Sequence, residues 1–358
     1  MPMLPPHRRV ILVALCLFVA ACESTGQPND TDQPGSSEPA ASTTPTDAGA
    51  RLLEYGFEAG QVYTYDLALE QHIVLQSEGT ADAIGEEGVP ESADVTVTAT
   101  GTFSFEVAAG PGEGTYSVTV NGTFPDSTVE GTVDGEPVDD ATDIDELGVI
   151  QPVSTVVVVD SQGRILDDST SPSDALGLGA TPLAGLSGDL GRIVGPILPA
   201  EPVTVGDTWT ETTTDTVLGD APVDTVMEAT LTGKEALAGA DTLVIGTTST
   251  TGQADMDLAD FFAEFMGAFA DPDDPEAQAQ LDRAIDQLVF RITIDPSSSE
   301  STTWFDPEQG VAARSTTSGP PTTFRMEVAM PDEETGELQS YSMRLDVTQA
   351  LDYTLVAS

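Results

Sequence analysis

The sequence predicts a mainly β protein with long, curved antiparallel strands that form a half-barrel or barrel. Apolar and polar residues alternate over segments longer than about ten residues, and turn signals such as GPGEG at 110–114 separate these segments. Strands with one apolar face belong to antiparallel sheets with one solvated side, and strands of this length must twist and curl. Two sequence landmarks also recur in the same order, which predicts two related β-repeats.

The first element along the chain is a predicted secretory signal at residues 1–21. A basic stretch precedes the apolar run VILVALCLFVAA, which is too short for an ordinary transmembrane helix. Cleavage is expected between Ala21 and Cys22. The motif from Val19 to Cys22 resembles the lipobox of bacterial lipoproteins, and the resemblance implies that the Cys22 thiol carries acyl chains. An ordinary signal peptide that ends by chance at a cysteine is the alternative.

The second element, residues 22–50, is expected to be the lipidated cysteine followed by a disordered tether. Residues 23–50 contain no Ile, Leu, Val, Met or aromatic residue, so they cannot bury enough apolar surface to offset chain entropy. The lipobox and the tether together predict an extracytoplasmic protein held on the bacterial cell membrane or envelope through acyl chains on Cys22.

The folded part is expected to comprise a first β-repeat at 51–200 and a second at 201–358. GQVYTYDL at 60–67 corresponds to GDTWTETT at 206–213, and VVVVDSQGRILDDST at 156–170 corresponds to TTWFDPEQGVAARST at 302–316. The landmark residues of the second repeat are Gly206, Asp207, Trp209 and Trp304. General similarity between any two antiparallel segments is the alternative to duplication.

The clearest strands place their apolar residues on one face. The first strand aligns Tyr63, Tyr65, Leu67, Leu69, Ile73 and Leu75, and the last aligns Tyr341, Met343, Leu345, Val347, Leu351, Tyr353 and Leu355. Because side chains alternate between the faces of a strand, each set is expected to point into one core.

Residues 255–289 depart from the β pattern and predict a helical hairpin inserted into the second repeat, with Asp255 or Asp257 as its N-cap. An apolar stripe follows helical spacing through Leu258, Phe261, Phe262, Phe265, Met266 and Phe269. This stripe is a candidate ligand pocket beneath a lid. The alternative is a plug, whose phenylalanines fill the concavity of the sheet as permanent core.

Composition limits the chemistry that the chain can perform. With 11 basic and 61 acidic residues the formal charge is −50, which opposes binding to nucleic acid. Cleavage would leave one histidine, His72, and the blocked Cys22, so neither a thiol nucleophile nor an ordinary zinc site is expected. No catalytic residue, metal ligand or cofactor motif is assigned, and the protein is expected not to be an enzyme. A hydrolase with a carboxylate pair remains a third choice without nominated residues.

The segment PAEPVTVGDTW at 199–209 resembles a Pro-Val-x-x-Gly-Asp-x-Trp segment of uncharacterised β-rich bacterial lipoproteins. More distantly, a lipidated half-barrel with helices in its mouth is similar in architecture to the LolA/LppX class of lipid carriers. The first resemblance implies no activity, and the second concerns architecture alone. The lipid anchor, the long curved strands and the inserted Phe-rich helix together predict a non-enzymatic lipoprotein that binds a lipid or other apolar ligand under that helix. A structural or protein-interaction module of the envelope with a filled core is the alternative.

Overall fold

The computed structural model describes residues 49–79, 90–138, 153–168, 195–217, 221–257, 289–331 and 338–357. These ranges contain strands and their connections and no helix. The predicted signal at 1–21, Cys22 and the tether as far as residue 48 lie outside the described residues. The predicted stripe from Leu258 to Phe269 also lies outside them.

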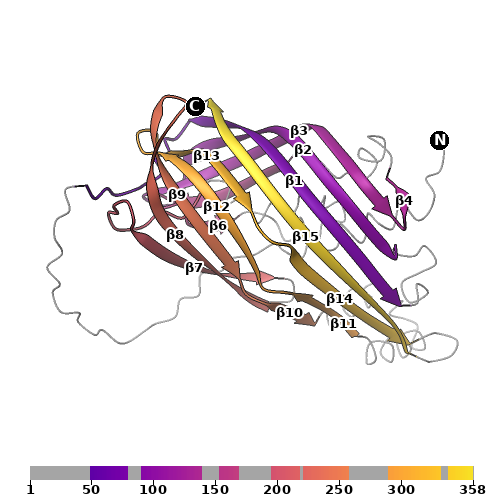
Figure 1. The fold of residues 1–358 in the computed structure, drawn as a ribbon. Coiled ribbons are helices and arrows are strands. Elements are labelled where there is room, and N and C mark those ends of the chain that lie inside the picture. The colour runs from indigo at the N-terminus through magenta and orange to yellow at the C-terminus, as the bar shows by residue number, and fades with distance from the viewer. Residues whose placement is uncertain are drawn as a thin grey trace, which may run out of the picture.

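The described strands form one antiparallel sheet (Figure 1). The strands of the first half are β1 (Val62–Gly79), β2 (Ser92–Ala109), β3 (Thr115–Val133), β4 (Glu136–Pro137), β5 (Val153–Asp160) and β6 (Ile165–Asp168). Those of the second half are β7 (Thr208–Val217), β8 (Ala221–Leu237), β9 (Ala240–Thr251), β10 (Ala254–Asp257), β11 (Val289–Ile294), β12 (Ser297–Asp306), β13 (Val311–Ser318), β14 (Thr322–Pro331) and β15 (Leu338–Ala357). The main path through the sheet runs β6-β5-β3-β2-β1-β15-β13-β12-β9-β8-β7.

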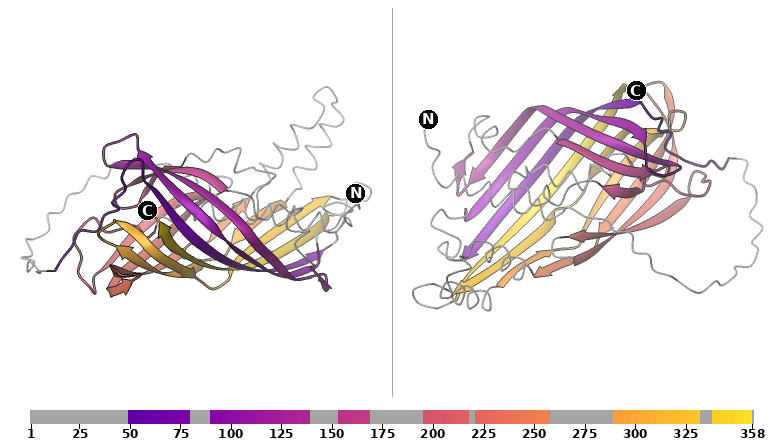
Figure 2. Two further views of the ribbon diagram at one scale, coloured as in Figure 1. Left: turned by 90° about the horizontal axis from the view of Figure 1, so that it is seen from above. Right: turned by 180° about the vertical axis from the view of Figure 1, so that it is seen from behind.

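The first and last described strands, β1 and β15, pair with each other at the centre of this sheet. β1 pairs with β15 from Thr64 to Gly79, whereas β6 and β7 lie at the two edges. The sheet curves strongly but does not close (Figures 1 and 2), so the half-barrel expectation is confirmed and the closed barrel is wrong. Among the described residues, β6 and β7 form no ladder with each other. One ion pair approaches across the gap, from Arg164 to Glu211 at 2.6 Å.

The alternation predicted for the first and last strands is confirmed. Every predicted inward residue of β1 is buried, and the inward residues of β15 are buried or half-buried. β1 and β15 are also in register, so Leu67 faces Tyr353 and Ile73 faces Val347. The inner face of the sheet is therefore apolar at its centre, as the period-two pattern requires.

Three long strands of the second half are each interrupted at the same level of the sheet. The breaks fall at residues 252–253 between β9 and β10, at 295–296 between β11 and β12, and at 319–321 between β13 and β14. Pro296, Pro320 and Pro321 lie in these breaks, and proline cannot donate a ladder hydrogen bond.

The predicted start of the helical hairpin at residue 255 is wrong. Asp255 lies inside β10, so it caps no helix, and Asp257 is the last residue of this strand. At the other limit of the predicted hairpin, Val289 is the first residue of β11. Ala254–Asp257 pairs with Arg291–Ile294 and buries Ala254 and Met256, so the period-two pattern continues to residue 257. The rest of the predicted hairpin, 258–288, lies outside the described residues.

One end of the half-barrel is filled by two segments that cross its inner face, and we call this the filled end. Residues 49–57 lie at this end in Figure 1, opposite the β14–β15 end of the sheet. The Tyr55 amide donates to the Ser161 carbonyl at 2.8 Å, and the Tyr55 hydroxyl donates to the Pro196 carbonyl at 2.8 Å. Arg51 and Val203 exchange two backbone hydrogen bonds. These contacts join 51–57 and 195–203 to each other and join 51–57 to the turn between β5 and β6.

Candidate functional site

The filled end has a solid core, which we call the filled-end cluster. It combines residues of the sheet with Leu53, Tyr55, Phe57, Leu198 and Val203 from the two crossing segments. The Tyr55 ring stacks on Phe57 with centroids 5.2 Å apart and meets Phe305 edge-on at 5.6 Å. Burial raises the pKa of the Tyr55 hydroxyl, and nearby Tyr353 contributes to the rise. The described side chains of this end therefore pack against one another rather than around a ligand.

The other end of the inner face, the far end, is built differently. Its apolar residues form a second cluster, the far-end cluster: Ile73, Leu75, Ala93, Val223, Ala254, Met256, Ile292, Ile294, Phe324, Tyr341, Met343 and Leu345. Every member lies on a strand, so among the described residues this cluster is a wall without a crossing segment. Methionine adapts its shape to irregular surfaces, and two methionines lie in the cluster.

Between the two clusters the inner face carries a band of hydroxyl side chains, which we call the hydroxyl belt. Its members are Thr247, Ser249 and Thr251 on β9, Ser297, Ser299, Ser301 and Thr303 on β12, and Ser315 and Thr317 on β13. Their register places them side by side: Ser301 faces Thr247 on one neighbouring strand and Thr317 on the other. Each of these strands therefore passes from apolar residues at the filled end to hydroxyls at mid-length.

The belt is partly satisfied by its own members. Thr303 and Ser315 share a buried hydrogen bond of 3.0 Å, and Thr251 shares one of 3.2 Å with Thr225 on β8. The Thr247 hydroxyl is buried and has no hydrogen-bond partner among the described residues. The inward residues next to the belt, Thr225 on β8 and Gln349 on β15, are uncharged as well.

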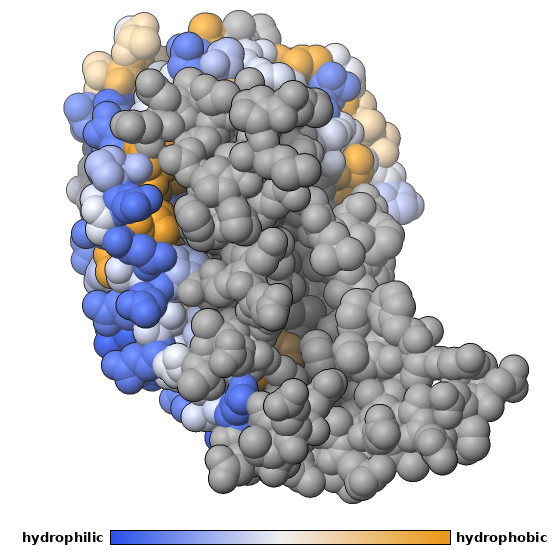
Figure 3. Space-filling view, turned by 90° about the vertical axis from the view of Figure 1, so that its right-hand side faces the viewer, coloured by the Kyte–Doolittle hydropathy of each residue, from blue (hydrophilic) through white to orange (hydrophobic). Residues whose placement is uncertain are grey.

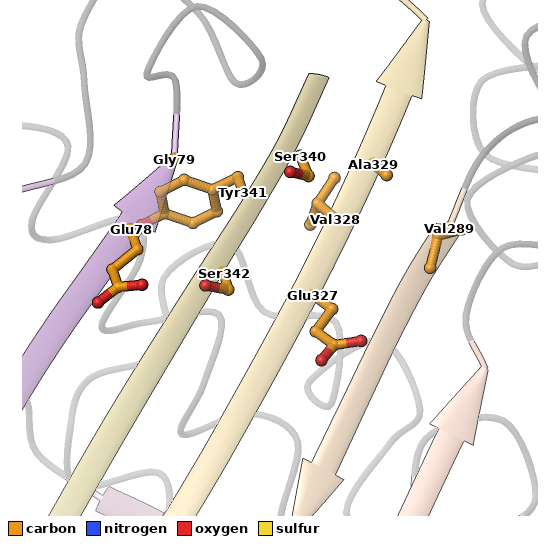
Figure 4. Close-up of a pocket in the computed structure, with 9 residues that line it drawn as sticks. All are labelled: Glu78, Gly79, Val289, Glu327, Val328, Ala329, Ser340, Tyr341 and Ser342. Atoms are coloured by element: carbon orange, nitrogen blue, oxygen red, sulfur yellow. The ribbon is translucent and has the colours of Figure 1, made fainter. Parts of the chain in front are cut away.

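A groove of about 460 Å³ lies where β1, β15, β14 and β11 approach the far end (Figure 4). Glu78, Ser342 and Glu327 face one another across β1, β15 and β14, and all three are exposed. Small residues, including Ser340 and Ala329, form much of its lining.

Figure 3 shows hydrophilic residues along one flank of the molecule and hydrophobic residues between that flank and the grey region.

The predicted landmark residues have structural roles and do not come together. The Asp207 carboxylate accepts hydrogen bonds from the Thr204 amide and hydroxyl at 2.7 and 2.9 Å, which lower the pKa of Asp207. The Trp209 indole donates to the Ile197 carbonyl at 2.8 Å. The Trp304 indole donates to Glu235 at 2.8 Å, while Arg314 lies 5.3 Å from its ring centroid.

Gly206 sits in a turn with the same hydrogen bonds as the first landmark. The Gly206 amide donates to the Leu231 carbonyl at 2.8 Å, as the Gly60 amide donates to the Val107 carbonyl at 2.8 Å. Both glycines have positive φ, 100° and 92°. The division into repeats at residue 200 remains a prediction.

The remaining sequence candidates add no second site. The His72 imidazole lies 2.8 Å from the Asp94 carboxylate in an exposed pair. The described residues contain no group of three or more His, Cys, Asp or Glu side chains that could hold a metal ion. No helix of the described part is long and apolar enough to cross a membrane. The candidate stripe Leu258, Phe261, Phe262, Phe265, Met266 and Phe269, together with Ala21 and Cys22, lies outside the described residues.

The hydroxyl belt was not predicted from the sequence pattern. The run SSSESTTW at 297–304 has hydroxyls on both strand faces, so no apolar–polar alternation marks the inner one. The sequence does contain one signal for the belt: alternate residues are apolar in the segments before and after this run, but not within it.

No family model and no curated protein sequence matches this chain. Among solved structures, lipovitellin aligns with a TM-score of 0.36 and 10% identity over 84% of this chain and 25% of its own. The chain thus spans a quarter of lipovitellin. A structure from Parabacteroides distasonis named as a putative lipoprotein gives a TM-score of 0.23 at 10% identity, covering 82% and 98% of the two chains. An outer membrane channel from Pseudomonas putida gives 0.21 at 9% identity, covering 88% and 100%. Such low TM-scores carry no argument about function.

Proposed function

We propose that this protein is an extracytoplasmic lipoprotein that binds an apolar or amphipathic ligand on the inner face of its half-barrel. The observation that carries the proposal is the far-end cluster, an apolar wall to which strands alone contribute within the part of the chain that the structure describes. An apolar sheet face must be buried against another layer, and a ligand would supply part of that layer. The proposal assigns no catalytic residue, metal or cofactor.

The anchor in this proposal rests on the sequence around Cys22. Two or more acyl chains hold a protein on a membrane firmly, because each buried CH₂ contributes about 0.8 kcal/mol. Replacement Cys22→Ser is expected to move the protein from the membrane fraction to the soluble fraction. Retention of the Cys22→Ser chain in washed membranes would contradict the anchor.

Ligand binding is tested by native mass spectrometry of protein purified from membranes, followed by solvent extraction. The expected result is a reproducible adduct beyond the mass of the acylated chain, with an extracted compound that accounts for it. The Cys22→Ser chain is the control. It carries no acyl chains, so an adduct on it must be bound to the folded part and not to the anchor. A clean mass for this chain from several preparations would contradict ligand binding.

The filled-end cluster favours a second function. The described side chains of that end form a solid core, as expected for the interaction-module alternative, in which the protein displays β-surfaces to a partner. This alternative predicts no extractable ligand, and a partner that stays bound to the Cys22→Ser chain at moderate salt.

A further inference from the structure

The hydroxyl belt indicates which ligand chemistry suits the inner face. Strand residues at the two ends of this face are apolar, so a fold that needed only a core would continue the same pattern through the middle. Instead, one row across three strands reads Thr247, Ser301 and Thr317. Ser301 and Thr317 are half-buried, so these hydroxyls are not fully occupied by the core.

Thr247 provides an independent sign of a missing partner. Its side chain lies on the inner face and is 7% exposed, and its hydroxyl has no hydrogen-bond partner among the described residues. A buried polar group without a partner is costly, and most buried polar atoms in proteins are paired. A ligand oxygen at this row would satisfy the Thr247 hydroxyl.

The absence of charge in the belt selects the kind of polar group. An ionic headgroup placed on the belt would lose hydration without gaining a counter-charge there, which is strongly unfavourable. Hydroxyl side chains donate and accept hydrogen bonds, so they suit ester carbonyls and ligand hydroxyls.

We infer that the hydroxyl belt is the subsite for an uncharged ester or hydroxyl group of an amphipathic ligand, whose apolar tail lies along the far-end cluster. The inference rests on the proposed ligand-binding function. An extended chain advances about 3.3 Å per residue, so Ser297 at the start of β12 lies at most roughly 17 Å from Ile292 on β11, across the break at 295–296. An acyl tail can follow that path from the belt.

The test compares two ligands that both carry a twelve-carbon chain, uncharged 1-lauroylglycerol and cationic dodecyltrimethylammonium. Binding is measured by calorimetric titration below their micellar concentrations. The protein is the mature chain with Cys22→Ser in 0.15 M NaCl. The inner variant carries Thr247→Val, Ser301→Ala and Thr317→Val. The matched control carries Thr248→Val, Thr302→Val and Thr316→Val on the opposite face of the same strands.

We expect the inner variant to raise the Kd of 1-lauroylglycerol about 10-fold or more, since each lost hydrogen bond weakens binding severalfold. The Kd of dodecyltrimethylammonium should change less than about threefold in either variant, and the control should bind both as the wild type does. If the inner triple variant does not fold, judged by its melting curve, Ser301→Ala alone is compared with Thr302→Val. Ser301→Ala is then expected to weaken the binding of 1-lauroylglycerol, by less than the triple variant would, and Thr302→Val is expected to leave it unchanged.

The outcomes separate the two proposals. If the wild type binds neither amphiphile, the proposed function itself fails. If it binds 1-lauroylglycerol but the inner and outer variants behave alike, the ligand-binding function survives and the assignment of the belt is overturned. Equal weakening of both ligands by the inner variant would likewise overturn it.

Discussion

At the residue scale, the close approach of Gly56 and Gly310 fixes the filled end. The Gly56 amide donates to the Gly310 carbonyl at 2.9 Å. A Cβ atom at Gly310 would lie 2.2 Å from the Gly56 nitrogen, and Gly310 has φ of 67°. Both the conformation and the space at position 310 therefore require glycine. The approach brings the β12–β13 turn against the segment that enters the core.

Replacement Gly310→Ala is predicted to destabilise the protein by about 2–4 kcal/mol, from roughly 1 kcal/mol of backbone strain and about 1–3 kcal/mol of overpacking. Gly135→Ala is the matched control, because Gly135 has φ of 76° and a Cβ atom there would meet no other atom within 4 Å. It should cost only the backbone strain. Urea unfolding of the Cys22→Ser chain measures both. If both variants lose the same unfolding free energy, the close approach of Gly56 and Gly310 adds nothing to the cost of Gly310→Ala.

At the element scale, β10 is a short strand at the border of the far end. It continues β9 after a break at 252–253 and has four residues, and among the described strands it pairs with β11 alone, whereas β9 pairs with both β8 and β12. Short edge segments open locally at low free-energy cost. The far-end wall therefore has a labile border next to Ala254 and Met256.

We predict that the amides of β10 exchange with deuterium at least about 10-fold faster than those of β9 in the full Cys22→Ser chain. Mass spectrometry of peptides covering the two strands measures this, with β1 and β15 as protected references. Addition of 1-lauroylglycerol should slow exchange in β10 more than in β9. Equal protection of β9 and β10 without ligand would contradict the prediction.

Sequence patterns predicted the strands in which apolar and polar residues alternate consistently. They missed strands in which this alternation is short, or in which polar residues occupy both faces. β1 and β15 were predictable because apolar residues recur at every second position over most of their lengths. Residues 255–257 of β10 were assigned to a helix because they adjoin a stripe with helical spacing. The belt on β12 was missed because serine and threonine occupy both faces, and only the pairing with β9 and β13 shows which hydroxyls point inward.

At the scale of the whole molecule, charge sets a constraint that no single contact removes. The chain has 61 acidic and 11 basic residues. Among the described residues, arginines already form ion pairs with carboxylates, including Arg314 with Asp352 at 2.6 Å and Arg325 with Asp295 at 2.6 Å. Most carboxylates must therefore repel one another across the outer face, and this self-repulsion destabilises the compact state.

Stability is predicted to rise with monovalent salt, because the Debye length falls from about 30 Å at 0.01 M to about 10 Å at 0.1 M. Salt also weakens the ion pairs, but exposed pairs contribute only about 0–1 kcal/mol each, and the excess of carboxylates outweighs them. Melting curves of the Cys22→Ser chain from 0.01 to 0.5 M NaCl should show a Tm that rises with salt, by about 1–2 °C for each kcal/mol of relieved repulsion. KCl and tetramethylammonium chloride should act alike if screening is the cause. A Tm that falls with NaCl would contradict the prediction, and a rise with NaCl alone would indicate a specific sodium site instead.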